Sequence, residues 1–136
     1  MNSFLSSWPQ YSEEEAEAIK KVLLSNKVNY WTGNLGRQFE TDFAKFSDCK
    51  FGIALANGTV ALDLALHGLS LGLNNGGFSD DEIIVTPRSF IASISTIINA
   101  GAKPIFVDVG KDSQNIEAHN VAEAITKKTR AIICVH

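Results

Sequence analysis

The sequence is poor in the residues that mark several classes of protein. Its 136 residues include only two cysteines, Cys49 and Cys134, which stand far apart and form no Cys-x-x-Cys pair. This spacing is not typical of a disulfide framework, so we expect reduced thiols, as in a cytoplasmic protein. The cysteines and the three histidines show no metal-ligand spacing either, so we expect no metal site.

Long runs of one charge or of apolar residues are also missing. Twelve basic and fifteen acidic residues give a net charge of -3 without a basic stripe, so we expect no nucleic-acid or membrane partner. No apolar stretch is long enough to span a bilayer. Residues 1–9 lack a positive charge and a long apolar run, so we expect no secretory signal there. The common nucleotide fingerprints and the Gly-x-Ser-x-Gly elbow are absent as well.

The most informative stretch that is present is a strand, turn and helix unit. Apolar residues alternate with small ones over 51–56, which predicts a short buried strand. Asn57 and Gly58 predict a turn, Thr59 stands where a helix N-cap is expected, and Gly72 suits the C′ position. The free N–H groups and positive dipole end of such a helix suit a phosphate. Many such units bind nothing, so the unit alone leaves a purely structural role equally open.

Two helices are expected before this unit. Ser12 and Glu15 form a capping box, which predicts a helix ending near residue 25. A second helix is predicted over 35–47, where three phenylalanines at i, i+4 and i+7 indicate a buried core face. These are Phe39, Phe43 and Phe46. In the loop 29–34 between the helices, Tyr30 and Trp31 either line a pocket or, more commonly, cover the edge of a core.

The chain from residue 51 onward alternates as β-α-β-α-β-α-β. Further strands are predicted over 82–86, 104–109 and 131–135, and we expect the loop 74–81, with its two aspartates, to be solvated rather than to hold a cation. Apolar strands joined by helices predict a parallel sheet covered on both faces, in an α/β fold of three layers.

Several polar or aromatic residues follow the ends of these strands. Ligands of such folds bind beyond the carboxyl ends of the strands. The residues at these ends are Asn57 to Thr59, Pro87 to Phe90, Asp108 and His136. We therefore expect a binding site at this rim.

Four groups of residues follow one another in a characteristic order. They are Tyr30-Trp31-Thr32-Gly33 with Phe39-Glu40, Ala56 to Leu62, Asp81 to Pro87 with Phe90-Ile91-Ala92, and Gly101 to Asp108. In this order they resemble the amino-terminal part of the DegT/DnrJ/EryC1/StrS aminotransferases, fold-type I enzymes that use pyridoxal phosphate to aminate keto-sugars on nucleotide carriers. The resemblance implies a mostly parallel α-β-α sheet belonging to the large domain of such a transferase. Residues 1–50 would be a helical segment with an active-site loop, and 51–136 an incomplete first part of the cofactor-binding domain.

The resemblance also implies roles for single residues. Asn57, Gly58 and Thr59 match the turn that holds the phosphate of pyridoxal 5′-phosphate, and Phe90 matches the aromatic residue that stacks on its pyridine ring. Both roles agree with the chemistry of the residues, because backbone amides at a helix start bind phosphate and a flat ring covers a flat cofactor.

The substrate side is implied in the same way. Thr32 and Gly33 match a loop near the substrate. The family implies a nucleotide-linked keto-sugar as substrate, glutamate as amino donor, a cytoplasmic homodimer in the full-length form, and a product used for cell-surface polysaccharide or glycan.

The sequence departs from the family pattern in two places. The loop 74–81 is longer than the usual connection, and the Schiff-base lysine and the aspartate of the pyridine nitrogen are expected beyond His136. We therefore interpret the chain as an enzyme fragment that is inactive alone and contains no catalytic residue. Two alternatives stay open, which are a non-catalytic α/β module for a phosphorylated ligand and a fold-type I enzyme acting on amino acids.

The part of the family pattern that is expected beyond His136 also affects the predicted pairing of the strands. In the fold-type I sheet, the strand before the phosphate turn pairs with chain that comes after His136. We therefore expect strands 82–86, 104–109 and 131–135 to form one parallel sheet, and 52–56 to stay outside it.

Overall fold

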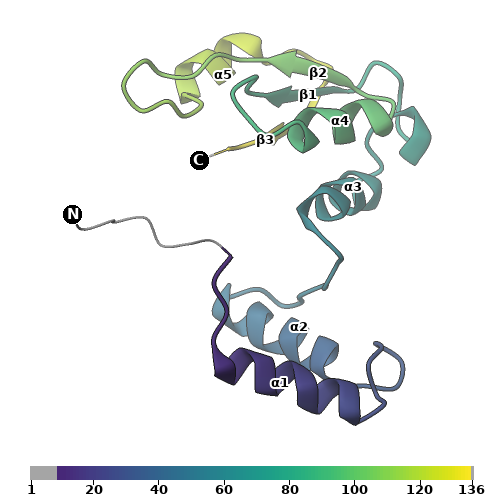
Figure 1. Ribbon diagram of the computed structural model, residues 1–136. Helices are drawn as coiled ribbons and strands as arrows, with labels where there is room; N and C mark the ends of the chain where they lie inside the picture. Colours follow the sequence, from purple (N-terminus) through teal and green to yellow (C-terminus); the bar gives the residue numbers. More distant parts are fainter. Residues whose placement is uncertain (1–8, 136) are drawn as a thin grey trace, which may run out of the picture. The chain divides into compact units, whose positions relative to one another are not determined.

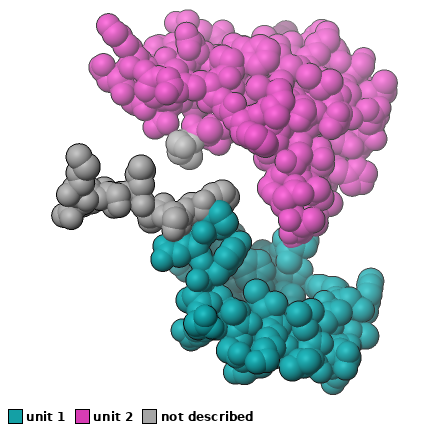
Figure 2. All heavy atoms as spheres, in the orientation of Figure 1, with its two compact units in different colours: residues 1–54 teal, residues 55–136 magenta. Residues whose placement is uncertain are grey.

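The chain forms two compact units, divided between Ala54 and Leu55 (Figure 2). The computed structural model describes residues 9–135. The first unit contains helices α1 (Glu13–Leu24) and α2 (Leu35–Phe46), and the second contains the sheet with its helices (Figure 1). Each unit is described separately below.

The capping box at the start of α1 is confirmed. The Ser12 hydroxyl accepts a hydrogen bond from the Glu15 N–H at 3.2 Å, and the Ser12 N–H donates to the Glu15 carboxylate at 2.7 Å. These bonds, from the backbone of Ser12 first and its hydroxyl second, hold the pKa of Glu15 below its ordinary value. The helix ends at Leu24 with Ser25 as C-cap, close to the predicted boundary.

The aromatic face of α2 is a correction to the sequence prediction. Phe39, Phe43 and Phe46 are 57%, 51% and 84% exposed, so they form no core here. The neighbouring rings do stack loosely, with centroids 5.6 and 5.9 Å apart. Within residues 9–54 only Ala44 is buried, because nothing in this unit covers the phenylalanine face.

The second unit alternates helices and strands around a parallel sheet. Its elements are α3 (Gly58–Gly68), a 3-10 turn η1 (Leu73–Asn75), β1 (Glu82–Val85), α4 (Ala92–Asn99), β2 (Lys103–Phe106), α5 (Ala118–Ala124) and β3 (Thr129–Ile133). The strand order is β2-β1-β3, and both pairings are parallel. Ile84 lies opposite Ile105 on one side and Ile132 on the other. The predicted α/β class and the three-stranded parallel sheet are therefore confirmed.

The segment before α3 belongs to no strand among the described residues. Phe51, Ile53 and Leu55 are all exposed, so the prediction of a buried strand over 51–56 is wrong for this chain. The expectation that 52–56 stays outside the sheet is confirmed. The alternating pattern is present, but a strand forms only where a neighbouring strand accepts and donates its backbone hydrogen bonds.

The core of the second unit lies between β1 and α4. Ile83, Ile84 and Val85 are fully buried, and Ile97 of α4 is buried against the face formed by Ile83 and Val85. Leu66 extends this cluster to α3, which packs on α4. Since β1 is covered by neighbours on both edges, it is the most protected element and a rigid base for the segments that follow the strands.

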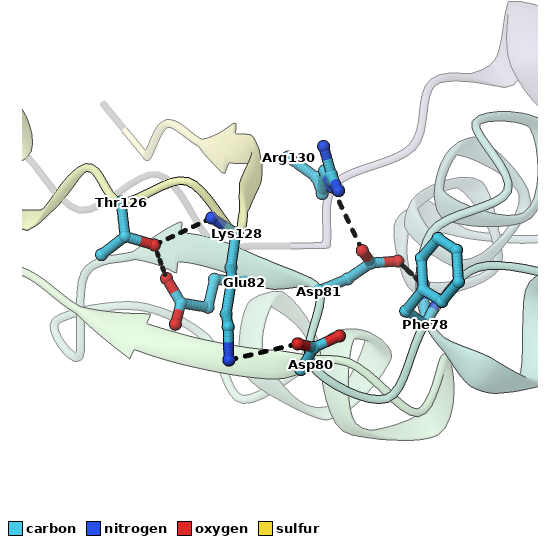
Figure 3. Close-up of polar contacts among 8 residues, drawn as sticks. Phe78, Asp80, Asp81, Glu82, Thr126, Lys128 and Arg130 are labelled. Carbon is cyan, nitrogen blue, oxygen red and sulfur yellow. Dashed lines mark hydrogen bonds and ion pairs between the residues drawn. The ribbon is translucent and has the colours of Figure 1, made fainter.

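Asp81 ties the loop before β1 to the sheet. Asp81 is only 3% exposed, and one of its carboxylate oxygens accepts from the N–H groups of Phe78 (2.9 Å) and Gly72 (3.0 Å). The other oxygen accepts from Arg130 Nε of β3 at 3.2 Å (Figure 3). The expectation of a solvated loop is thus wrong at Asp81, while Asp80 stays at the surface, paired with Lys128.

Gly72 also differs from its predicted role. The left-handed residue after α3 is Ser70, with φ of 53°, and the C-cap is Leu69. Gly72 has φ of 80° and begins the 3-10 turn instead. A Cβ at this position would collide with the carbonyl oxygen of Ala100, so glycine is needed here for close packing of the loop on the end of α4.

Candidate functional site

The residues expected to hold a cofactor line one cleft in the second unit. This cleft has a volume of about 540 Å³. Its lining residues are Asn57, Gly58, Thr59, Leu62, Phe90, Ala92 and Ser93. The structure therefore brings together all four residues that the sequence singled out for cofactor binding, although Phe90 is separated from the others by the whole of α3 and β1.

The start of α3 offers unused hydrogen-bond donors to the cleft. Asn57, not Thr59 as predicted, is the N-cap, and its side-chain oxygen accepts from the Val60 N–H at 3.1 Å. The first intrahelical bond runs from the Ala61 N–H to the Asn57 carbonyl at 3.1 Å. The N–H groups of Gly58 and Thr59 precede it and are left for an outside acceptor. Asn57 caps better because its extended backbone lets the side chain reach the third helical N–H.

Two further features of the cleft suit a phosphorylated aromatic ligand. The space where residue 58 would carry a Cβ contains no atom within 4 Å, so a phosphate can approach the backbone there closely. Phe90 stands just before α4 with 75% of its surface exposed. An exposed ring of this kind presents a flat apolar face on which another ring can stack.

The predicted substrate residues lie in the first unit. The Asn29 side-chain oxygen accepts from the Thr32 N–H at 3.0 Å and from the Thr32 hydroxyl at 3.1 Å, and the Asn29 carbonyl accepts from the Gly33 N–H at 2.8 Å. A Cβ at residue 33 would lie 2.5 Å from the Lys27 carbonyl oxygen. Thr32 and Gly33 thus belong to a tightly built loop, which lines a hollow of about 740 Å³ beside α1.

Glu40 joins this loop to the segment that leaves the first unit. Its carboxylate accepts from the Tyr30 hydroxyl at 3.1 Å and from the Ala54 N–H at 3.0 Å. Arg37 covers the Tyr30 ring, with its guanidinium carbon 4.7 Å from the centroid. Tyr30 is therefore held by both neighbours, while Trp31 is exposed.

Other residues expected at the rim do not join the cleft. Asp108 lines a separate hollow with Asn120 and Glu123. Arg88 bonds instead to the side chain of Gln114. His136 lies outside the described residues.

Within residues 9–135, no amine lines the cleft. All nine lysines are exposed, and none lines it. Between residues 9 and 135, no group of three metal-ligating side chains comes together. In the same range, no helix has the length and apolar character needed to cross a membrane.

Sequence reasoning missed the contribution of α4 to the cleft. Ala92 and Ser93, its first two residues, line the cleft beside Phe90. The sequence offered one sign of this, because Ser93 follows Phe90 by three residues and so returns to the same side at the start of a helix.

The sequence matches known proteins along almost its whole length. Residues 9–136 match the model of the DegT/DnrJ/EryC1/StrS aminotransferase family. The chain is 38% identical over 128 residues to the GDP-perosamine synthase of Escherichia coli O157:H7, covering 94% of this chain and 33% of that one.

Solved structures of aminotransferases are also similar to the chain. An aminotransferase from Psychrobacter cryohalolentis is 52% identical, with a TM-score of 0.89 over 96% of this chain and 32% of its own. The PLP-form of Spr1654 from Streptococcus pneumoniae is 29% identical, with a TM-score of 0.80 over 91% of this chain and 30% of its own. The chain thus spans about a third of the length of the proteins it matches.

Proposed function

Because the chain belongs to the DegT/DnrJ/EryC1/StrS aminotransferase family, we propose that its cleft binds pyridoxal 5′-phosphate in an aminotransferase acting on a nucleotide-linked keto-sugar. The observation that carries this proposal is the meeting of Asn57, Gly58, Thr59 and Phe90 around one cleft. The sugar substrate is supported by the relation to a GDP-perosamine synthase, and the cofactor by the likeness to a structure in its PLP-form.

Each cleft residue has a different proposed role in binding the cofactor. The N–H groups of Gly58 and Thr59 donate to the phosphate at the positive end of α3, and the Thr59 hydroxyl adds a third donor. Asn57 keeps the turn in place by capping α3. Phe90 covers one face of the pyridine ring and keeps water from it. When bound, this cofactor supplies an electron sink for amino-group transfer.

The loop of the first unit is proposed to meet the substrate. The Thr32 hydroxyl donates its proton to Asn29, and its oxygen can accept a hydrogen bond from a sugar hydroxyl. Gly33 keeps the chain compact where any side chain would collide with Lys27. The proton transfers of the reaction need a lysine at the cofactor, and none of the nine lysines lines the cleft. We therefore propose that this group, and the acid that pairs with the pyridine nitrogen, come from chain outside residues 1–136.

The remaining assignments follow from the family. We propose glutamate as amino donor, a homodimer as the working form, and a glycan or polysaccharide precursor as the product. The cytoplasm is the proposed location, as the family implies.

The experiment is a reaction with the protein produced from its complete gene. Pyridoxal phosphate, glutamate and a nucleotide-linked keto-sugar are supplied, and the amino-sugar is detected by mass spectrometry. We expect amino-sugar formation that depends on both the cofactor and glutamate. A protein that binds phosphate but not pyridoxal phosphate would instead be a binding module, and one that aminates only free keto-acids would act on amino acids.

A further inference from the structure

The cleft is built from the beginnings of two helices. Gly58 and Thr59 are the first two residues of α3, and Ala92 and Ser93 are the first two of α4. In both helices the second residue carries a hydroxyl group. Two positive dipole ends with a hydroxyl at each favour an anion more than either end alone.

Ser93 is buried but is hydrogen-bonded in an unusual way for a helix. The residue is 8% exposed, and the Ser93 hydroxyl lies 2.7 Å from the Ser89 hydroxyl. Thr96, one turn later, donates to the Ala92 carbonyl at 2.8 Å, which is the ordinary arrangement for a hydroxyl inside a helix. Within residues 9–135, Ser93 makes no such bond to a carbonyl.

The pair of serines leaves one proton available to the cleft. The Ser89 hydroxyl reaches two acceptors, the Ser93 hydroxyl at 2.7 Å and the Phe90 carbonyl at 3.3 Å. A hydroxyl has one proton and two lone pairs. When Ser89 donates along the shorter contact, Ser93 is held as an acceptor and its own proton is free for a ligand oxygen in the cleft.

We infer that Ser93 is a further cofactor-binding residue, which donates its hydroxyl proton to a phosphate oxygen of the ligand in the cleft. Ser89 orients this hydroxyl from behind. The phosphate is then held between α3 and α4, with Thr59 donating from one helix and Ser93 from the other. This inference rests on the proposed function, because it adds a residue to the same cofactor site.

The test uses the protein from the complete gene and pyridoxamine 5′-phosphate, whose amine does not condense with lysine. Loss of a hydrogen bond to a charged group weakens binding by about tenfold or more. We expect Ser93→Ala to raise the dissociation constant by this factor. Ser93→Thr keeps the hydroxyl and stays close to wild type. Ser95→Ala, the same change two residues along α4 and outside the cleft, leaves the constant unchanged.

A second ligand shows whether Ser93→Ala removes a contact with the phosphate or disturbs the whole cleft. Pyridoxamine lacks the phosphate, so Ser93→Ala and wild type are expected to bind it equally. Equal affinity of Ser93→Ala and wild type for the phosphorylated ligand, with Thr59→Ala weakened, overturns the role of Ser93 and leaves the proposed function standing. The same loss for both ligands also overturns it. Failure of the wild type to bind the phosphorylated ligand removes the proposed function and, with it, this inference.

Discussion

Asp81 is the only charged side chain that is buried among the described residues. The backbone N–H of Phe78, then that of Gly72, and more weakly Arg130 hold the pKa of its carboxyl below the ordinary value, while burial acts the other way. Because the pKa of Asp81 is lower in the folded chain than in the unfolded chain, the ionised Asp81 carboxylate stabilises the fold at neutral pH. This stabilisation is lost as the pH falls from the ordinary Asp value of about 3.9 through the lowered pKa of the folded chain.

Replacing Asp81 by Asn tests this anchor. The amide oxygen can still accept from the two N–H groups, but the amide NH₂ then faces the Arg130 donor. We expect Asp81→Asn to lower the free energy of unfolding by about 1–3 kcal/mol, measured by urea denaturation. The acid-induced fall in the urea midpoint should also become smaller in this variant.

Asp80 provides the matched control. Its partner is Lys128 at 3.1 Å, and both side chains are about half exposed, so Asp80→Asn should change the stability by less than about 1 kcal/mol. Equal effects of the two substitutions would mean that the burial and hydrogen bonds of Asp81 do not stabilise the fold.

Thr59 and Asp63 distinguish the start of α3 from its middle. Thr59 lines the cleft, whereas Asp63 lies one turn further and borders a different hollow. In the protein from the complete gene, Thr59→Ala should weaken binding of pyridoxamine 5′-phosphate by about tenfold, and Asp63→Ala should not, as measured by equilibrium dialysis. Unchanged binding in Thr59→Ala would remove this hydroxyl from the phosphate site.

Single residues also mark the limit of sequence reasoning. The pattern Asn57-Gly58-Thr59 located the turn, but it could not decide which of two capping residues adopts the extended backbone that a cap needs. It also gave no sign that Asp81 is buried and Asp80 exposed, because adjacent aspartates in a loop look alike until tertiary contacts separate them.

At the scale of elements, we expect the backbone amides of β1 to be protected from hydrogen exchange much more strongly than those of residues 53–56. Ile83, Ile84 and Val85 are fully buried and paired on both sides, whereas 53–56 belongs to no sheet. Hydrogen exchange of the 136-residue chain should therefore be slowest in 83–85 and fast at residues 53, 55 and 56. Ala54 should exchange more slowly than its neighbours, because its N–H donates to Glu40. Comparable slow exchange throughout 53–56 in a verified monomer would mean that this segment has found a partner strand.

Elements with local signals could be predicted, and those that need distant partners could not. The capping box of α1 and the apolar runs of the three strands are contained in short stretches of sequence, and all of these elements form. β2 and β3 end at residues 106 and 133, before the predicted ends at 109 and 135. The segment 51–56 has an equally clear alternation, but its structure depends on a strand that residues 9–135 do not supply. The cleft was predictable in its α3 half. Its α4 half was missed because Ser93 lies between Ile91 and Ile94, which with Ile97 and Ile98 have the spacing of a buried helix face.

At the scale of the whole molecule, the chain leaves a large apolar surface exposed. In the first unit this surface includes the phenylalanine face of α2, which is more than half exposed at every ring. The chain spans about a third of the length of its relatives. The phenylalanine spacing that predicts a core face therefore also fits a face that is covered by other parts of a longer protein.

The chain's span of about a third of its relatives' length also predicts how it reacts with free pyridoxal phosphate. The 136-residue chain is mixed with pyridoxal phosphate, reduced with borohydride and mapped by mass spectrometry. We expect weak labelling spread over the nine exposed lysines, because none of them lines the cleft. The protein from the complete gene should label one lysine outside this chain. Stoichiometric labelling of a single lysine among residues 1–136 would overturn the assignment of that group to another part of the protein.

The strand order β2-β1-β3 affects how the chain folds while it is being made. β1 is synthesised before both of its neighbours, and β2 leaves the ribosome before β3. The nascent chain can then close one edge of β1, but the other edge stays unpaired until residues 129–133 emerge. Arg130 arrives with them, so Asp81 has no cationic partner until then. In that interval the most apolar strand of the sheet is open on one side, and this edge is where a chaperone or a second nascent chain would bind.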